Sequence, residues 1–343
     1  MAGDGYRVGV LGATGLVGTT ILELLSARDF PAAEVVPFAS ERSAGRELRW
    51  NGSTLVCREL SEDSIQGLDL VLSSAGGAVS AEWTPRLVEA GATVVDNTSY
   101  WRMHDDVPLV VAEVNPDALD GHNGIVANPN CSTMQMVVAL KPLYDEAGIE
   151  RLVISTYQAV SGTGKAAIDE LREQSRAVLA GEQAAASVYP HPIAFNVLAQ
   201  AGSFPAGDDH TDEERKLINE TRKILGDEEI RVSATCVRVP VVTGHSEAVN
   251  VETQEALSPE RARELLSAAP GVTVVDDPAA GRYPIATEAA GKDDVFVGRI
   301  RRDPGNERAL DIWIVSDNLR KGAATNTVQL AELLVQRDLL GRS

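Results

Sequence analysis

The sequence predicts an α/β protein with two domains: one built on a mainly parallel sheet, and an α+β domain with a mixed or antiparallel sheet. Up to about residue 130, short apolar runs typical of strands alternate with helix-like stretches. After Cys131 the strand-like runs become longer, as in sheets whose strands pair antiparallel. The chain has 343 residues, more than the roughly 250 to 300 at which a single core usually stops growing.

The first element is a buried strand over Tyr6–Leu11 that leads directly into a glycine-rich turn and then the apolar helical stretch Ile21–Leu25. Glycines let a backbone approach a pyrophosphate closely, and a helix N-terminus offers free N–H groups and a positive dipole end. This order predicts a Rossmann-type domain that binds a nucleotide. The spacing is GxxGxxG rather than GxGxxG, so a plain strand-to-helix turn is the alternative. The expected contacts are Gly12, Thr14, Gly15, Leu16 and Val17.

The remaining elements are predicted from apolar patterning. Strands are expected at Glu34–Ala39, Leu68–Ser73, Thr93–Asp96, Ile125–Ala127, Leu152–Tyr157, Arg231–Val239, Ala248–Glu255, Asp294–Arg301 and Ala309–Val315. Helices are expected at Gly162–Ala180 and Thr211–Leu225, separated by a loop over Gly202–His210. Lys321–Leu334 has helical spacing and is expected to pack back on the first domain.

Composition and charge exclude several kinds of partner. A net charge of -19 argues against a nucleic-acid surface but is compatible with small anions bound in a local basic pocket. The three cysteines form no CxxC pair, which argues against a disulfide scaffold and a metal site. The N-terminal residues lack the apolar core of a signal peptide, and no run approaches the ~20 apolar residues of a membrane span. We therefore expect a cytoplasmic protein without membrane partners.

Two segments of the second half carry reactive side chains: Asn-Cys-Ser around Cys131, and the stretch from Arg238 to His245. Cys131 precedes the apolar run Met134–Leu140, so its sulfur is expected at a helix N-terminus, where the dipole favours the thiolate. The neutral imidazole of His245, at the end of a strand-like segment, can take the thiol proton and later manage the proton of the tetrahedral intermediate. The guanidinium of Arg238 suits a substrate carboxylate. A buried small cysteine, a surface or core histidine and a solvated arginine are the plain structural alternatives.

Cofactor choice is predicted from the residues after the strand at Glu34–Ala39. An acid there commonly binds the ribose 2′-hydroxyl of NAD, whereas an arginine accommodates the 2′-phosphate of NADP. The chain has Ser40, Arg42 and Ser43 at this point, which favours NADP, although Glu41 stands among them. Ser74 and Gly76, at the end of another strand, are expected beneath the nicotinamide half.

Five segments in order resemble aspartate-semialdehyde dehydrogenases over nearly the full length of the chain. They are Gly12–Gly18, Asn128–Thr133, Gln158–Gly162, Arg238–Val241 with Gly244-His245, and Val297–Ile300. The resemblance implies an NADP-binding Rossmann domain of residues 1–130 plus 319–343. It also implies a catalytic and dimerisation domain of residues 131–318, in a homodimer or homotetramer.

The resemblance also implies residue roles. Cys131 is the nucleophile, Gln158 orients the acyl intermediate and Arg238 binds the substrate carboxylate. Glu213 would contact the substrate amine and Lys216 the phosphate, although two residues three apart on a helix could equally form a surface ion pair. Arg102 and the amide of Asn130 would complete the phosphate site; Ser161, Gly162 and Asn318 are implied as further cofactor contacts.

The implied reaction is the reversible, NADP-dependent and phosphorylating conversion of L-aspartate 4-semialdehyde to L-4-aspartyl phosphate through a cysteine thioester. This places the enzyme in the aspartate pathway to lysine, methionine and threonine. N-acetyl-glutamyl-phosphate reductases and acyl-CoA reductases use related chemistry and remain alternatives. An NADP-binding sensor without turnover is the alternative of another class; it would need neither Cys131 nor His245.

Overall fold

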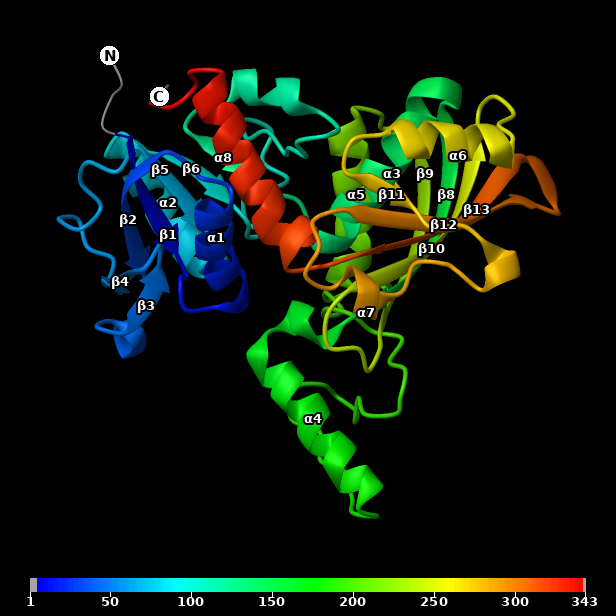
Figure 1. Cartoon of the computed structure of the whole chain (residues 1–343), viewed down its shortest axis with the longest axis horizontal. Coiled ribbons are helices and arrows are strands. Elements are labelled where there is room, and N and C mark those ends of the chain that lie inside the picture. The colour runs from blue at the N-terminus through cyan, green and yellow to red at the C-terminus, as the bar shows by residue number, and fades with distance from the viewer. Residues whose placement is uncertain (1–4, 342–343) are drawn as a thin grey trace. The chain divides into compact units, whose positions relative to one another are not determined.

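The chain folds into two units, each with its own sheet, and the computed structural model describes residues 5–341 (Figure 1). The first unit contains the residues up to Asn130 together with those from Ala323 onward, and the second is Cys131–Gly322. Within residues 5–341, no helix has both the length and the apolar character needed to cross a membrane.

The sheet of the first unit is parallel, with the strand order β2-β1-β5-β6-β7. Leu11 at the end of β1 pairs with Phe38 of β2 and with Ser73 of β5, so these three strands end at the same edge of the sheet. A small hairpin of β3 and β4 follows β2 in the chain. The strands are β1 (Tyr6–Leu11), β2 (Ala32–Phe38), β3 (Glu47–Trp50), β4 (Ser53–Val56), β5 (Leu70–Ser73), β6 (Thr93–Asp96) and β7 (Ile125–Ala127).

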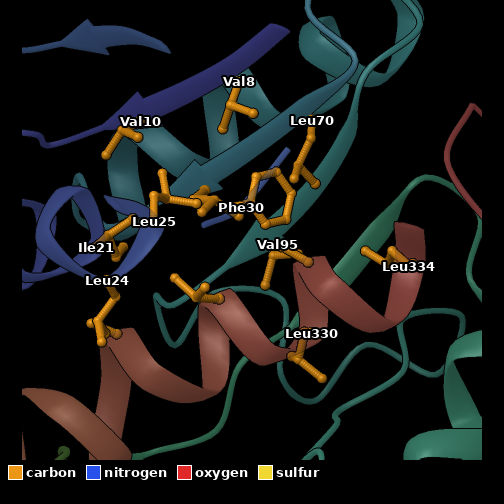
Figure 2. Close-up of a cluster of buried hydrophobic side chains, with 14 of the residues drawn as sticks. Val8, Val10, Ile21, Leu24, Leu25, Phe30, Leu70, Val95, Leu330 and Leu334 are labelled. Atoms are coloured by element: carbon orange, nitrogen blue, oxygen red, sulfur yellow. The ribbon is translucent and has the colours of Figure 1, made fainter. Parts of the chain in front are cut away.

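Helices cover both faces of this sheet. α1 (Leu16–Ala27) and α8 (Asn326–Gln336) lie on one face and share a buried apolar core with β1, β5 and β6 (Figure 2). α2 (Gly77–Glu89) places Leu87 in a second cluster on the opposite face, with Leu11 and Phe38. The C-terminal helix therefore packs on the first unit, as its pattern predicted, with Leu330 and Leu334 fully buried.

The C-terminal helix differs from the prediction at its start. A single helix was expected over Lys321–Leu334, but a π-helical turn, Arg320–Thr325, precedes α8. Such turns inside or before α-helices are frequent at functional sites because they change which side chains share a face. This one crosses the boundary between the two units and contains Gly322.

The second unit has a six-stranded mixed sheet in the order β11-β12-β13-β10-β8-β9. The central pairs are antiparallel, whereas β11 with β12 and β8 with β9 are parallel, in agreement with the predicted mixed or antiparallel sheet. Its strands are β8 (Ile149–Gln158), β9 (Arg231–Arg238), β10 (His245–Thr253), β11 (Val272–Val274), β12 (Val295–Asp303) and β13 (Asn306–Ser316).

One strand assignment was wrong. The sequence placed His245 at the end of a strand-like segment, but β9 ends at Arg238 and β10 begins at His245. Pro240 in the intervening loop has no N–H for the sheet ladder, which explains why the strand stops there. His245 is thus the first residue of a strand.

The two faces of this sheet differ in environment. α3, α5 and α6 cover one face, while the other bears a hollow of about 700 Å³ lined by residues that include Ala248, Trp313, Tyr283 and Ile285. In β8 and β10 alternate side chains are buried under the helices, which is the period-two pattern of a strand. The helices of the unit are α3 (Cys131–Ala147), α4 (Lys165–Leu179), α5 (Asp212–Leu225), α6 (Pro259–Ala268) and α7 (Ala286–Ala289).

Candidate active site

Four buried polar side chains lie at one end of the second unit's sheet, on the face that α3 covers. Gln158, at the end of β8, pairs with Arg238, at the end of β9, and His245, at the start of β10, pairs with Ser316 of β13. Cross-strand partners point to the same face of a sheet. Strand register therefore brings three of the predicted residues together although they are far apart in the sequence.

Cys131 is the first residue of α3, so its sulfur stands at the helix N-terminus, as the apolar run after it predicted. It is partly exposed, whereas Ser132 is fully buried and accepts a hydrogen bond of 3.0 Å from Nε2 of Gln158. Gly322 packs directly on Cys131, because a Cβ at that position would lie 2.8 Å from Cβ of Cys131. The first turn of α3 is thus fixed from two sides.

Glu213 and Lys216 form a partly buried pair that joins this row of residues. Gln158 Nε2 also donates to Oε1 of Glu213 (2.9 Å), and Lys216 Nζ lies 3.0 Å from Oε2 of Glu213 and 2.9 Å from Oδ2 of Asp212. Burial lowers the pKa of Lys216, but the two carboxylates outweigh it and the pKa is raised, so the ammonium stays charged. With Glu213 only 8% exposed, this is not the surface ion pair that the spacing alone allowed.

The start of α5 explains why Glu213 points inward. Thr211 caps the helix: its hydroxyl accepts from the backbone N–H of Glu214 (3.2 Å), and Oε2 of Glu214 accepts from the backbone N–H of Thr211 (2.9 Å). Such a capping box fixes the first helical turn. Oε1 of Glu214 accepts from the backbone N–H of Cys236 in β9, which ties this turn to the sheet.

His245 is completely buried, and its ring is oriented by the backbone. The N–H of Ala159 donates to Nδ1 at 3.0 Å, while Nε2 has no hydrogen-bond partner in the part of the chain that the structure describes. Burial, reinforced by the guanidinium of Arg238 and only partly opposed by Glu213, lowers the pKa of His245 to about 3. The imidazole is therefore neutral at physiological pH.

Arg238 lies beside His245 and is 6% exposed. Its Nη1 donates to the carbonyl of Ala159 (2.8 Å), and its guanidinium stands 5.9 Å from the centre of the Tyr189 ring, within cation–π range. Among the described residues its Nε has no partner, so the guanidinium retains a donor for a ligand. A Cβ at Gly162 would lie 3.3 Å from both Nη1 of Arg238 and Nε2 of His245, so glycine leaves this space open.

Ser161 and Asn318, expected as cofactor contacts, lie close to these groups and bind each other. Nδ2 of Asn318 donates to the Ser161 hydroxyl (2.9 Å), and its Oδ1 accepts from the N–H of Gly244 (2.9 Å). Asn318 thereby fixes the loop that precedes His245. Asn318 therefore stabilises this loop, in addition to any contact that it makes with a cofactor.

A second set of buried side chains lies on the same face of this sheet, two residues further along the strands β8, β9 and β10. Thr156 of β8 pairs with both Glu247 of β10 and Cys236 of β9. Glu247 is completely buried, with a relative exposure of 0%. Within residues 5–341, neither of its carboxyl oxygens makes a hydrogen bond of normal geometry. Burial raises its pKa well above 4.5, and the amide of Gln135 on α3 opposes this only in part. Glu247 is therefore a neutral carboxylic acid inside the unit.

The first unit contains the expected nucleotide turn. Gly12 has φ +73°, and a Cβ there would lie 2.5 Å from the carbonyl oxygen of Ser74; a Cβ at Gly18 would lie 2.2 Å from that of Gly12. Thr14 and the N-cap residue Gly15 complete the turn, and Leu16 and Val17 open α1. This cradle fits a dinucleotide pyrophosphate because only glycines allow such close packing beneath a helix N-terminus.

The other predicted cofactor residues of this unit lie at the same edge of its sheet. Ser40 precedes the short 3₁₀ turn Glu41–Ser43 that follows β2 and contains Arg42, and Ser74 and Gly76 follow β5. β2 and β5 flank β1, and the chain order reverses between β1 and β5, where ligands bind in doubly wound sheets. The structure therefore gathers these residues around the glycine turn.

Arg102 and Asn130 also belong to the first unit, whereas Lys216 belongs to the second. Arg102 is 6% exposed and donates to the carbonyls of Asn128 and Asn97, each at 2.9 Å. Asn326 of α8 donates to Oδ1 of Asn128 (2.7 Å), so a buried polar network supports the segment that leads into Cys131. Arg102 thus already braces this segment through the main chain.

Several site residues escaped the sequence analysis. Tyr189, Gly322 and the Gln135–Glu247 pair belong to no motif, and only their positions in the fold identify them. Ser132 was adjacent to the predicted nucleophile, and its small hydroxyl beside a cysteine was the available signal.

Two family models match this chain, one in each unit. The model described as semialdehyde dehydrogenase, NAD binding domain, matches residues 7–122, and the model described as semialdehyde dehydrogenase, dimerisation domain, matches residues 140–321. Together they cover most of the chain. The fold and the two matches define an oxidoreductase of the semialdehyde dehydrogenase class.

Individual relatives narrow this class. The aspartate-semialdehyde dehydrogenase of Aquifex aeolicus is 54% identical over 340 residues, which are 98% of this chain and 100% of that protein. The chain belongs to the aspartate-semialdehyde dehydrogenase family. Aspartate semialdehyde dehydrogenase II of Vibrio cholerae, in a crystal structure complexed with ASA, is 46% identical with a TM-score of 0.94, covering 97% of this chain and 98% of that one. The enzyme of Candida albicans, crystallised with NADP, is 28% identical with a TM-score of 0.74, covering 97% and 99%.

Proposed function

We propose that this chain catalyses the reversible, NADP-dependent and phosphorylating conversion of L-aspartate 4-semialdehyde to L-4-aspartyl phosphate. In the cytoplasm it would run toward the aldehyde, in the biosynthesis of lysine, methionine and threonine. The observation that carries the proposal is the row of Arg238, Gln158 and His245, with the helix that begins at Cys131 hydrogen-bonded to Gln158. A thiol at a helix N-terminus and a neutral imidazole at the same end of the sheet suit thioester chemistry.

Cys131 is proposed to add to the aldehyde carbon and to carry the acyl group as a thioester until phosphate takes it. Gln158, held between Ser132 and Glu213, would orient the acyl group. Arg238 would bind the α-carboxylate with its unpaired donor. His245 would take the proton of the Cys131 thiol and later manage the proton of the tetrahedral intermediate.

Glu213 and Lys216 are proposed to separate their tasks when substrates bind. The substrate ammonium would take the side of Glu213, and phosphate the side of Lys216, so each ligand replaces one half of the present ion pair. Arg102 and the amide of Asn130 are proposed to complete the phosphate site. A buried carboxylate favours a free amine over the acetylated nitrogen of the N-acetyl-glutamyl rival, which carries no charge.

The first domain, proposed as residues 1–130 plus 319–343, would bind NADP through the glycine turn, with Arg42, Ser40 and Ser43 at the 2′-phosphate. When bound, NADP supplies the two-electron oxidant of the reaction. Ser74 and Gly76 of this domain, with Ser161, Gly162 and Asn318 of the second, are proposed as further contacts. The second domain, residues 131–318, would carry catalysis and dimerisation.

The decisive assay is phosphate-dependent reduction of NADP, and separately of NAD, with L-aspartate 4-semialdehyde as substrate. Turnover that requires phosphate and prefers NADP supports the proposal. Turnover only with N-acetylglutamate semialdehyde, or only with coenzyme A in place of phosphate, would identify one of the rival reductases. Binding of NADP without turnover on any of these substrates would identify the sensor.

Cys131→Ala tests the thioester. It should abolish turnover while NADPH still binds, because the glycine turn lies in the other unit. Cys57→Ala is the matched control, since Cys57 is a buried cysteine of the first unit. A substantial rate in Cys131→Ala would rule out the covalent mechanism.

We also propose that the uncovered face of the second unit's sheet forms a homodimer or homotetramer interface. The hollow there is lined mainly by apolar side chains, and Tyr283 and Ile285 are 45% and 39% exposed. Ile285→Asp should lower the molar mass measured by light scattering. An unchanged mass would place the interface elsewhere.

A further inference from the structure

We propose that Tyr189 is a positioning residue for substrate recognition: its ring holds the guanidinium of Arg238 in the orientation that binds the α-carboxylate. This role rests on the proposed function, in which Arg238 binds that carboxylate. The contacts of Tyr189, and the way in which α4 fixes the loop around it, carry the proposal.

The guanidinium of Arg238 is fixed at one end by a hydrogen bond and open at another. Its Nη1 donates to the carbonyl of Ala159 at 2.8 Å, whereas its Nε has no partner among the described residues. A guanidinium binds a carboxylate through two parallel N–H groups, so the orientation of its plane decides how well it binds. One hydrogen bond allows the plane to turn about that bond. A contact with the face of the guanidinium is what fixes it before the ligand arrives.

Tyr189 supplies this contact. Cζ of Arg238 stands 5.9 Å from the centre of the Tyr189 ring, inside the range of about 6 Å for a cation–π contact. Arg238 is 6% exposed, and such contacts are stronger when the cation is desolvated. The Tyr189 hydroxyl donates to Oγ1 of Thr163 at 2.9 Å, so the ring is also held at its far end. Thr163 follows Gly162, the glycine that leaves the space beside Nη1 of Arg238 open.

Tyr189 lies in a loop, residues 185–194, that a buried carboxylate of α4 holds through the main chain. Oε2 of Glu170 accepts from the backbone N–H groups of Ser187 (3.0 Å) and Val188 (2.6 Å), and from the hydroxyl of Ser187. Burial raises the pKa of Glu170, but the hydroxyl of Ser187 and the N–H groups of residues 187 to 189 outweigh it and the pKa is lowered. Glu170 is therefore a carboxylate at neutral pH, and it anchors the loop at the residues that precede Tyr189.

Gln174, one helical turn further along α4, holds both ends of the same loop. Its Oε1 accepts from the N–H groups of Ile193 (2.8 Å) and Ala194 (3.1 Å). Its Nε2 donates to the carbonyl of Ala185 (2.7 Å) and to Oε1 of Glu170 (3.1 Å). Glu170 and Gln174 are 7% and 3% exposed, and buried polar groups are costly when they lose their partners. These hydrogen bonds therefore keep the loop in one conformation.

Tyr189→Leu and Tyr189→Phe separate the ring from its hydroxyl. Leucine has no ring face, so Tyr189→Leu should raise KM for L-aspartate 4-semialdehyde about 5- to 30-fold and leave kcat within about threefold. Phenylalanine keeps the ring, so Tyr189→Phe should keep KM within about twofold. Tyr144→Leu is the matched control, because Tyr144 is a partly buried tyrosine of the same unit whose hydroxyl binds Asp227. An unchanged KM in Tyr189→Leu, or an equal rise in both Tyr189 variants, would overturn the role of the ring.

3-Aminopropanal tests whether Tyr189 acts through Arg238, because it is the same amino aldehyde without the α-carboxylate. With enough enzyme to follow slow turnover, Tyr189→Leu should have the wild-type kcat/KM for 3-aminopropanal. The guanidinium then has no carboxylate to bind, so its orientation no longer matters. An equal loss with both aldehydes would mean general damage to the site and would overturn the proposal.

Glu170→Ala tests the anchor of the loop. Without the carboxylate, Tyr189 is no longer held against Arg238, so KM should rise as in Tyr189→Leu. The double variant should be no worse than Tyr189→Leu alone, because both changes remove the same contact. Asp169→Ala, at a neighbouring side chain of α4 that is 50% exposed, is the control and should leave KM unchanged. Additive effects in the double variant would overturn the link between the loop and Tyr189.

The contact can also be measured without turnover. Nitrogen-15 spectra of the arginine side chains, with Arg238→Lys used to assign the Arg238 signal, report the ring current of Tyr189 at Nε–H. Tyr189→Leu should shift this signal, and Tyr189→Phe should leave it in place. An unmoved signal in Tyr189→Leu would refute the contact even if the enzyme is fully active. A wild-type protein without phosphate-dependent turnover would instead refute the proposed function and leave this measurement standing.

Discussion

Replacing Glu247 by glutamine should stabilise the protein increasingly as the pH rises. Glu247 is fully buried, and its pKa is raised well above 4.5, first by burial, while the Gln135 amide opposes the shift. Glutamine has the same shape and cannot ionise, so Glu247→Gln leaves no cavity and removes only the titration. The substitution therefore isolates the protonation of this one carboxyl group.

The magnitude comes from the difference in bound protons between the folded and unfolded states. Above about pH 4.5 the unfolded chain has released the proton of Glu247, whereas the folded protein keeps it up to its raised pKa. In that window the wild-type free energy of unfolding falls by about 1.4 kcal/mol per pH unit from this group alone. Below about pH 4.5 the Glu247 carboxyl is protonated in both the folded and the unfolded state, so it no longer changes the free energy of unfolding with pH. The difference between Glu247→Gln and wild type should therefore widen by about 2.7 kcal/mol over two pH units inside the window.

Urea unfolding of both proteins over a pH series measures this difference. The other titratable groups are common to both proteins, so their pH dependence cancels when the two free energies of unfolding are subtracted. Trp313 in β13 is the single tryptophan of residues 131–322, so its fluorescence reports on the correct sheet. Glu260→Gln on α6, at a side chain 77% exposed, controls for the isosteric exchange and should give a difference that does not change with pH. A pH-independent difference for Glu247→Gln would refute the argument that Glu247 is protonated in the folded state.

Three further changes test the site. Gly322→Ala should lower kcat about 10²-fold, because its Cβ would lie 2.8 Å from that of Cys131 and displace the cysteine. Gly121→Ala, at a glycine in open space, should leave kcat unchanged, and equal rates for the two variants would refute the contact. Arg42→Ala should raise KM for NADP by about 10 to 100-fold and leave KM for NAD unchanged, with exposed Arg49→Ala as the control; an unchanged NADP preference would exclude Arg42 as the 2′-phosphate contact. Arg238→Lys should raise KM for the aldehyde at least about tenfold, since lysine lacks the planar fork for a carboxylate; an unchanged KM would remove Arg238 from the substrate site.

The elements and sheet types could be predicted from the sequence because their signals are local. β1, β6 and β7 have the predicted bounds, since apolar runs flanked by turn residues need no tertiary information. The start of α8 was wrong because the π-helical turn around Gly322 depends on packing against Cys131, which no spacing encodes. The start of β10 was misread because its first residue lies after a proline- and glycine-containing loop.

The candidate site could be predicted in part, and the division follows its chemistry. Cys131, Arg238 and His245 carry reactive groups within recognisable segments, so they could be named. Tyr189 and Glu247 could not be found, because a ring beside a guanidinium and a carboxyl inside a sheet acquire their properties only from burial and neighbours. The orientation of the His245 ring likewise depends on one backbone N–H, that of Ala159 just after the end of β8.

Strand register explains why the site can be assembled from distant segments. Side chains alternate between the two faces of a sheet, so a shift of β10 by one residue would turn His245 from the α3 face to the face with the hollow. The deeper residues Val249 and Val251 are 1% and 0% exposed on that same covered face, and they would move into the hollow together with His245. Exposing two such side chains costs about 3 to 6 kcal/mol, a large part of the stability of a typical domain. The apolar pattern of the strand therefore fixes the position of the imidazole, and the burial that stabilises the sheet is also what keeps His245 neutral.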